Sequence, residues 1–142
     1  LLLDRNTLPG FNDSGAHITN MAFFDGNLTS LKLAQQDSLA TVSTMVKRLT
    51  SEPAAFFGLD VGSLEIGAQA DIVLIDPEAL SRWDDNASRR FIHRELFAHK
   101  QLVSRSDGVV SQVLIRGEPV WRDGEFTAAL GRETLGRALR AA

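Results

Sequence analysis

The sequence predicts an α+β fold, and three observations predict it. Apolar residues recur at a helical period between residues 39 and 49, which indicates an amphipathic helix. A β-branched apolar run fills residues 70–76 and is closed by Asp-Pro, which indicates a buried strand. A further apolar run over residues 109–115 is followed by an Asp-Gly turn at residues 123–124, a strong hairpin signal. The character of the chain changes at Gly58, from helical signals to strand signals.

The helix over residues 38–49 is the best defined element. Asp37 or Ser38 can cap its N-terminus, and Lys47 and Arg48 lie in its last turn, where positive charge suits the helix dipole. Its predicted apolar stripe consists of Leu39, Val42, Met45, Val46 and Leu49. Upstream of it, residues 8–11 read as a strand or extended segment, and residues 29–36 as a short helix.

A second, short helix is predicted over residues 54–57. Ser51 is its expected N-cap, and Gly58 is its expected left-handed C-cap. The strand over residues 70–76 should then be buried on both faces or against a neighbouring sheet, because it is a nearly continuous apolar run.

Residues 78–99 read as a polar, charged excursion that is long for a loop, and we expect it to contain one or two helical turns. Its isolated apolar anchors are Trp83, Phe91 and Phe97. The strand over residues 109–115 and a hairpin at 119–126 follow. A weak amphipathic helix, interrupted by Gly136, is expected in the tail over residues 133–139.

Composition bounds the classes of protein to which the chain can belong. Its 142 residues suit one domain, and its net charge of −3 comes with scattered basic residues, so nucleic acid is not an expected partner. The chain contains no cysteine, which fits a reducing compartment such as the cytoplasm. The apolar run Leu1 to Leu3 is too short for a membrane span, so no membrane partner is expected. Because the first residue is not Met, we interpret the N-terminus as processed or truncated.

The stretch from Gly10 to His17 is the one that indicates chemistry. A short apolar run leads to Asp13, and Gly15 and Ala16 leave room for a ligand near the backbone. A carboxylate at the end of a strand is well placed to transfer protons in an active site. We therefore interpret Asp13 as one part of a catalytic site. The structural alternative is that Asp13 and His17 belong to an ordinary helix start.

Three stretches taken together resemble the C-terminal part of metal-dependent amidohydrolases, and within them the N-acyl-D-amino-acid deacylases. Residues 12–17, Asn-Asp-Ser-Gly-Ala-His, are similar to the segment that carries the family's catalytic aspartate after the eighth barrel strand. Residues 49–76 are similar to the passage from the last barrel helix into a small β-domain. Residues 113–125 resemble the closing hairpin of that domain. The Asp-Ser-Gly-Ala-His form is nearer to the deacylase branch than to dihydroorotases.

This resemblance implies a chemistry and a role for each motif residue. The family's enzymes are (β/α)₈ barrels in which one or two metals, usually zinc, activate a water that attacks an amide carbonyl. By resemblance, Asp13 orients that water and carries its proton to the leaving amine, and it is a candidate single ligand of the metal. Ser14 and His17 are implied to support the site or to face the substrate. The implied substrate is a small linear amide such as an N-acyl amino acid.

The resemblance also implies a division of the chain. Residues 1–58 correspond to the end of the barrel, with its last strand, the catalytic aspartate loop and the last helices. Residues 59–127 correspond to a small β-sandwich-type domain with a long insertion at 78–100. Residues 128–142 correspond to a C-terminal tail.

The family's metal ligands are not found in this sequence. Its three histidines are His17, His93 and His99, and none forms the His-x-His pair of the family. Since zinc requires three or four ligands, we expect no complete metal site in this chain. We therefore expect a C-terminal fragment of the parent enzyme that is inactive alone and binds no metal alone.

Two alternatives belong to other classes. The chain could be a catalytically inactive fragment or assembly module that forms a homo-oligomer through exposed apolar surface. A separate chain that carries the rest of the barrel could also complement it. The apolar residues expected to be exposed are Leu8, Phe11, Phe23, Phe24 and the stripe within residues 39–49.

Other conspicuous residues receive structural interpretations. His93 and His99 are expected on the surface, and Arg89 with Arg90 on a solvated face. The remaining expectations are that Trp83 and Trp121 anchor the packing and that Asp71 and Asp76 serve turns.

Overall fold

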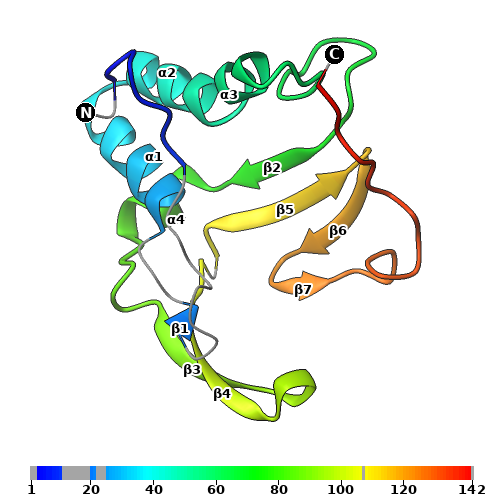
Figure 1. The fold of residues 1–142 in the computed structure, drawn as a ribbon. Helices are drawn as coiled ribbons and strands as arrows, with labels where there is room; N and C mark the ends of the chain where they lie inside the picture. The colour runs from blue at the N-terminus through cyan, green and yellow to red at the C-terminus, as the bar shows by residue number, and fades with distance from the viewer. Residues whose placement is uncertain (1–2, 11–19, 22–24, 107, 142) are drawn as a thin grey trace.

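Helices gather at one end of the molecule, and an antiparallel sheet lies beside them (Figure 1). The computed structural model describes residues 3–10, 20–21, 25–106 and 108–141. Helices α1 (Gly26–Asp37), α2 (Leu39–Leu49) and α3 (Ser51–Phe56) follow one another along the chain. The predicted mixture of early helices and later strands is confirmed in these residues.

Local capping defines the helix ends. Ser38 caps α2 as predicted, since its side chain accepts a hydrogen bond of 3.1 Å from the backbone N–H of Thr41. Asp25 caps α1 in the same way, through the N–H of Leu28 at 3.1 Å. The prediction that Ser51 caps α3 is wrong: Thr50 occupies the cap position, without a side-chain bond, and Ser51 lies in the first turn.

The predicted left-handed end of α3 is confirmed. Gly58 has φ +65°, and its N–H bonds to the carbonyl of Ala55 at 3.2 Å. The next N–H, of Leu59, bonds to the carbonyl of Ala54 at 2.8 Å. These two bonds form a Schellman motif, which satisfies the carbonyls at the helix end.

The core lies between the helices and the start of the strand region. Its buried members are Leu28, Leu31, Ala34, Met45, Leu80, Trp83 and Val109. From the predicted stripe of α2, Met45 is 1% exposed and both Val42 and Leu49 pack against this core. The other two members were predicted wrongly: Leu39, at the first turn, is 81% exposed and Val46 is 46% exposed. The buried face of α2 is thus narrower than the stripe.

Four strands form an antiparallel sheet in the order β2-β5-β6-β7. They are β2 (Ile72–Ile75), β5 (Val110–Ile115), β6 (Glu118–Arg122) and β7 (Glu125–Phe126). The predicted turn at Asp123 and Gly124 is confirmed, with φ of 51° and 94°. Two successive positive φ angles are those of a type I′ hairpin turn, for which Asp-Gly is well suited.

Strand β2 is less covered than predicted. It is the edge of the sheet and pairs with β5, while Val73 is 54% exposed and Leu74 42% exposed. Because successive side chains of a strand point to opposite faces, both faces of β2 present apolar surface. The prediction of a strand buried on both faces is therefore wrong in this structure.

The helical turns predicted for the excursion after β2 are confirmed, but the excursion also contains two strands that were not predicted. It contains helix α4 (Pro77–Arg82), strand β3 (Arg89–Arg94), the 3₁₀ turn η1 (Glu95–Phe97) and strand β4 (His99–Ser104). Strands β3 and β4 pair in antiparallel register, from Arg89 opposite Ser104 to Arg94 opposite His99. The short strand β1 (Asn20–Met21) adds to β4 in parallel, which gives the sheet order β1-β4-β3.

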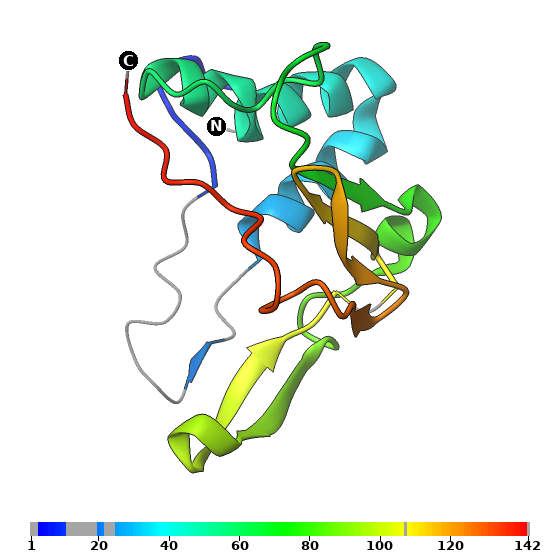
Figure 2. The ribbon, with the colours of Figure 1, turned by 90° about the vertical axis from the view of Figure 1, so that its right-hand side faces the viewer.

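The β3–β4 hairpin projects away from the rest of the molecule (Figures 1 and 2). It does not stack on the four-stranded sheet as a second layer, so the β-sandwich expected for residues 59–127 is not confirmed. Of the predicted anchors, Trp83 is buried, but Phe91 and Phe97 were predicted wrongly because they lie exposed on this projecting arm. Trp121 packs as predicted, with its ring edge-on to that of Phe126 at 4.9 Å between centroids.

The tail and the early segment lack their predicted regular structure. Residues 127–141 contain no helix, so the helix predicted over residues 133–139 is not formed. Gly136 lies within this stretch and disfavours a helix, and an isolated short helix is marginal in water. Arg137 instead donates a hydrogen bond of 2.8 Å to the carbonyl of Asp60, which attaches the tail to the loop after α3. Residues 8–10 are not in a strand, and Phe11 lies outside the described residues.

Candidate functional site

The predicted catalytic residues lie outside the part of the chain that the structure describes. Asp13, Ser14 and His17 all fall within residues 11–19, which the structure does not describe. The structure does describe the segment that enters this stretch, residues 3–10, and the strand β1 that follows it. The candidate site is therefore defined by what holds these two flanking segments.

A buried arginine holds the entering segment. The Arg48 side chain, in the last turn of α2, is 5% exposed. Its Nη2 donates to the carbonyl oxygens of Asp4 (2.7 Å) and Thr7, and to Oγ1 of Thr7 (3.2 Å). Its Nε lies 3.3 Å from Oε2 of Glu52, one turn further along the chain. Guanidinium is suited to this contact, since its planar fork of N–H groups can bind several acceptors at once.

The segment has a small turn of its own at Asp4. The Asp4 carboxylate accepts hydrogen bonds from the backbone N–H of Asn6 (2.9 Å) and from its side-chain amide (3.2 Å). The bond from the Asn6 backbone is the main cause that lowers the pKa of the Asp4 carboxyl, with a smaller contribution from the positive charge of Arg48. The turn presents the Asp4 carbonyl to Arg48.

Gly10, the last described residue before the motif, lies against both helices. Its φ is +117°, a conformation that favours glycine, and an added Cβ would lie 3.4 Å from Oδ1 of Asn27 and 3.6 Å from Cδ2 of Leu49. The chain thus enters the stretch that carries Asp13 at a fixed place between the start of α1 and the end of α2.

The β3–β4 hairpin and α1 hold the exit from that stretch. Strand β1 pairs with β4, with Asn20 opposite Leu102 and Met21 opposite Val103. Five residues after β1 the chain enters α1, whose N-cap Asp25 fixes the start of the helix. The hairpin is therefore attached to the chain that leaves the predicted catalytic motif, a relationship that the sequence analysis missed.

The described residues do not form a metal site. No group of three or more His, Asp or Glu side chains within residues 3–10, 25–106 and 108–141 is placed to hold a metal ion. His93 is on the hairpin surface as predicted and lies 3.5 Å from Oε1 of Glu95 through its Nε2. His99 is half-buried, with Nδ1 2.9 Å from the carbonyl of Phe97. No helix among these residues is long and apolar enough to cross a membrane.

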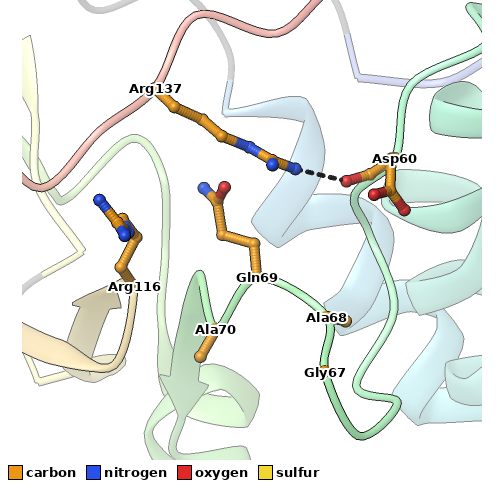
Figure 3. A pocket seen from close by; sticks show the side chains of 7 residues that line it. All are labelled: Asp60, Gly67, Ala68, Gln69, Ala70, Arg116 and Arg137. Atoms are coloured by element: carbon orange, nitrogen blue, oxygen red, sulfur yellow. Dashed lines mark hydrogen bonds between the residues drawn. The ribbon is translucent and has the colours of Figure 1, made fainter. Parts of the chain in front are cut away.

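A cavity of about 420 Å³ opens between the loop after α3, the approach to β2 and the tail. Figure 3 shows Gln69 pointing toward Arg137, whose guanidinium reaches the Asp60 carbonyl. Arg116 lines the other side of the cavity. The cavity contains no histidine and no pair of carboxylates, so its lining provides no acid–base set for hydrolysis.

Of the two aspartates that flank β2, Asp71 serves a turn as predicted, whereas Asp76 caps a helix. Asp71 accepts a hydrogen bond of 2.9 Å from the backbone N–H of Arg116. Asp76 caps α4, where its carboxylate accepts from the N–H groups of Glu78 (2.8 Å) and Ala79 (3.0 Å). Neither carboxylate is available as a second catalytic acid.

Comparison with known proteins gives a family match that includes the motif. Residues 8–121 match the Amidohydrolase family. An uncharacterized protein of Mycobacterium tuberculosis is 35% identical over 126 residues, which cover 82% of this chain and 20% of that protein. A D-phenylhydantoinase of Escherichia coli is 32% identical over 102 residues, or 70% of this chain and 21% of that enzyme. A dihydroorotase of Geotalea daltonii is 44% identical over 50 residues, or 35% of this chain and 12% of that enzyme.

The chain spans about a fifth of the length of the first two of these relatives. No solved structure matches it.

Proposed function

The chain belongs to the amidohydrolase family, and on this premise we propose that it forms part of a hydrolase that cleaves amide C–N bonds of small molecules. The observation that carries this proposal is the family match over residues 8–121, because it includes the motif with Asp13. Two relatives are named as a hydantoinase and a dihydroorotase, which supports the same reaction class.

We further propose that the substrate is a linear amide of the N-acyl amino acid type. The support is the Asp-Ser-Gly-Ala-His form of residues 13–17, which is nearer to the N-acyl-D-amino-acid deacylases than to dihydroorotases. The test is a panel of N-acyl amino acids of both configurations, beside hydantoin and dihydroorotate, assayed with the intact protein that carries this chain. Release of free amino acid is the expected result. Turnover of only the cyclic amides would overturn the linear substrate and leave the family reaction in place.

Asp13 is the proposed proton carrier of this reaction. The oxygen of a water forms a bond to the amide carbonyl carbon, and Asp13 accepts the proton that the water loses. The C–N bond then breaks, and Asp13 returns the proton to the leaving nitrogen, which departs as the amine. A carboxylate suits both steps because it is ionised at neutral pH and can be protonated transiently.

The described structure supports this role through the segments that flank Asp13. Arg48 binds the carbonyls of Asp4 and Thr7 on the entering side, and β1 pairs with β4 on the leaving side. A catalytic group needs a defined position, since small displacements from the productive geometry cost much of the rate. We propose that these two attachments define the ends of the catalytic loop.

We propose that zinc or another divalent metal binds to the intact protein that carries this chain, and not to the chain alone. The described residues do not fit such an ion, because they bring no three potential ligands together. Ligands would have to come from other residues. The measurement is metal content: the 142-residue chain should purify without stoichiometric metal, and the intact protein should contain it. Stoichiometric zinc in the chain alone would overturn this division.

A second candidate function is an assembly module without catalysis. The observation that favours it is the apolar surface at Val73 and Leu74 of β2 and at Phe56 and Phe57, which are 71% and 59% exposed at the end of α3. Apolar surface of this kind marks association sites. Sedimentation velocity tests it: a stable homo-oligomer supports the module, and a monodisperse monomer counts against it.

A further inference from the structure

We propose that the β3–β4 hairpin, residues 89–104 with the following Arg105, is a contact site for an anionic lipid bilayer, which revises the expectation that the chain has no membrane partner. Through β1 the hairpin borders the segment that carries Asp13, but the inference does not depend on the proposed catalytic role. Three properties of the hairpin carry the inference: its shape, the apolar side chains at its tip, and its charge.

The shape is convex. Both views show the hairpin extending from the body of the molecule, with η1 at its far end. Small ligands bind in concave pockets, whereas a projecting tip contacts a larger surface. The hairpin therefore suits a large partner surface better than a small molecule.

The tip is apolar and exposed. Leu96 is 87% exposed and Phe97 is 53% exposed, both within η1, and Phe91 on β3 is 66% exposed. These side chains are largely exposed, although the Phe97 ring also lies 6.0 Å from that of His99. Insertion into the boundary between headgroups and acyl chains would remove them from water.

The net charge of the hairpin is opposite in sign to that of the rest of the chain. Residues 89–105 contain five arginine and lysine residues and one glutamate, a net charge of +4, of which Arg89 is paired with the buried Asp85 that precedes the hairpin. The whole chain carries −3, so the remainder carries −7. An anionic surface attracts the hairpin and repels the remainder, which orients the molecule with its tip toward that surface.

The order of side chains along the hairpin favours a bilayer over an acidic protein. The apolar residues Leu96 and Phe97 are outermost, and the exposed Arg94 and Lys100 are set back from them along β3 and β4. A bilayer presents phosphates outside its apolar region, so the two layers of the hairpin match the two layers of the membrane surface. An acidic protein surface would need the basic residues and not the apolar tip.

Among the described residues β3 is an edge strand of its sheet, and its charges disfavour one register of pairing with a second copy. In an antiparallel β3–β3 pair centred between Phe91 and Ile92, Arg89 would face the partner's Arg94, since their numbers are symmetric about that centre. Like charges directly opposite one another destabilise a strand pair. The charges on β3 thus disfavour this register of edge pairing.

Glu95 opposes the inference locally and provides a sharp test of it. This carboxylate is at the tip, and its side chain is 94% exposed. A negative charge next to anionic phosphates weakens adsorption. Glu95→Gln should therefore strengthen binding to anionic vesicles, about fivefold for one charge.

The experiment is co-sedimentation of the 142-residue chain with mixed phosphatidylglycerol–phosphatidylcholine vesicles and with pure phosphatidylcholine vesicles. Binding to the mixed vesicles is expected, and much weaker binding to the neutral ones. The tip variant Leu96→Ser with Phe97→Ser should lower the partition coefficient about tenfold or more, because two apolar side chains are lost from the interface. The charge variant Arg94→Gln with Lys100→Gln should lower it on the order of 20-fold.

Matched controls come from exposed residues elsewhere in the described chain. Phe56→Ser with Phe57→Ser removes two exposed apolar side chains at the end of α3, and Lys47→Gln with Arg82→Gln removes two exposed basic charges. Both controls should bind the mixed vesicles like the parent. Absence of binding to anionic vesicles would overturn the proposal. Loss of binding in the charge variant but not in the tip variant would overturn the insertion of the tip and would indicate adsorption by charge alone.

Discussion

Replacing Arg48 with methionine should release the segment that leads to Asp13. The Arg48 side chain is 5% exposed. Methionine keeps an apolar side chain in this buried position and removes the guanidinium. The carbonyl oxygens of Asp4 and Thr7 then lose their donor. Glu52 loses its partner at 3.3 Å. The matched control is Arg82→Met in α4, where the arginine is 73% exposed and lies 3.7 Å from Glu78.

The size of the effect follows from burial. Hydrogen bonds from a charged donor each contribute about 1.5 kcal/mol or more, and two bonds to carbonyls are lost. Burying the guanidinium is itself costly, and the exposed carbonyls can bind water once it is removed, which offsets part of the loss. We expect Arg48→Met to lower the free energy of unfolding by about 2 kcal/mol. Arg82→Met should change it by less than about 0.5 kcal/mol, since exposed ion pairs contribute little.

The assay is urea unfolding of the 142-residue chain, followed by circular dichroism. Hydrogen exchange provides a local measurement, because the N–H of Thr7 bonds to the Asp4 carbonyl at 3.2 Å and should exchange faster in Arg48→Met. If Arg48→Met and Arg82→Met are equally stable and Thr7 exchanges at the same rate in both, Arg48 does not hold this segment.

Three further perturbations test the fold. Gly62→Ala should destabilise more than Gly124→Ala, because a Cβ at Gly62 would lie 2.8 Å from backbone atoms whereas Gly124, with φ +94°, has open space; the unfolding free energies, expected to differ by at least about 1 kcal/mol, decide this. Met45→Ala should cost about 2–5 kcal/mol in the same unfolding assay, and Leu39→Ala near zero, since Met45 is 1% and Leu39 81% exposed; equal losses would contradict the assigned core. Since folding lowers the pKa of Asp4, its carboxylate stabilises the chain above the ordinary pKa near 3.8 and loses this effect as pH falls through the lowered pKa. Asp4→Asn should therefore reduce the loss of unfolding free energy at acid pH. An unchanged loss would show that Asp4 makes no contribution.

The parts of the fold that could be predicted depend on short-range signals. The cap at Ser38, the left-handed Gly58 and the Asp-Gly turn at 123–124 each require only a few neighbouring residues. Hydrogen bonds between neighbours determine these features, and so the sequence displays them directly.

The β3–β4 hairpin could not be predicted because its strands lack the usual alternation. Strand β3 is Arg-Arg-Phe-Ile-His-Arg, with adjacent apolar residues between charged ones, and Phe91 is exposed. Strand β3 is held by pairing with β4. Strand β4 in turn pairs with β1, some 80 residues earlier in the chain. Such pairing leaves no periodic pattern in a single strand.

The exposure of β2 has a related cause. An apolar run predicts a covered strand only if an element exists to cover it. In the described residues, β5 pairs with one edge of β2, while Val73 and Leu74 remain exposed. The sequence of β2 is that of a buried strand, and the chain as described leaves it partly uncovered.

The candidate site was predictable only as a motif. Asp13, Ser14 and His17 were selected from sequence, and their placement stays a prediction because they lie outside the described residues. The contacts of Arg48 with Asp4 and Thr7 join segments more than 40 residues apart, and in sequence Arg48 is an ordinary basic residue at a helix end. The tertiary fold alone brings them together.

The most direct test of the proposed function is the rate of amide hydrolysis by Asp13→Asn in the intact protein that carries this chain. Asparagine keeps the shape of aspartate but cannot take up the proton, so kcat should fall by about 10²- to 10⁴-fold. Asp123→Asn is the matched control, because asparagine also tolerates the φ of 51° at that turn, and it should retain full activity. Retention of wild-type kcat by Asp13→Asn, with an active Asp123→Asn beside it, would contradict the assignment of Asp13 as the proton carrier.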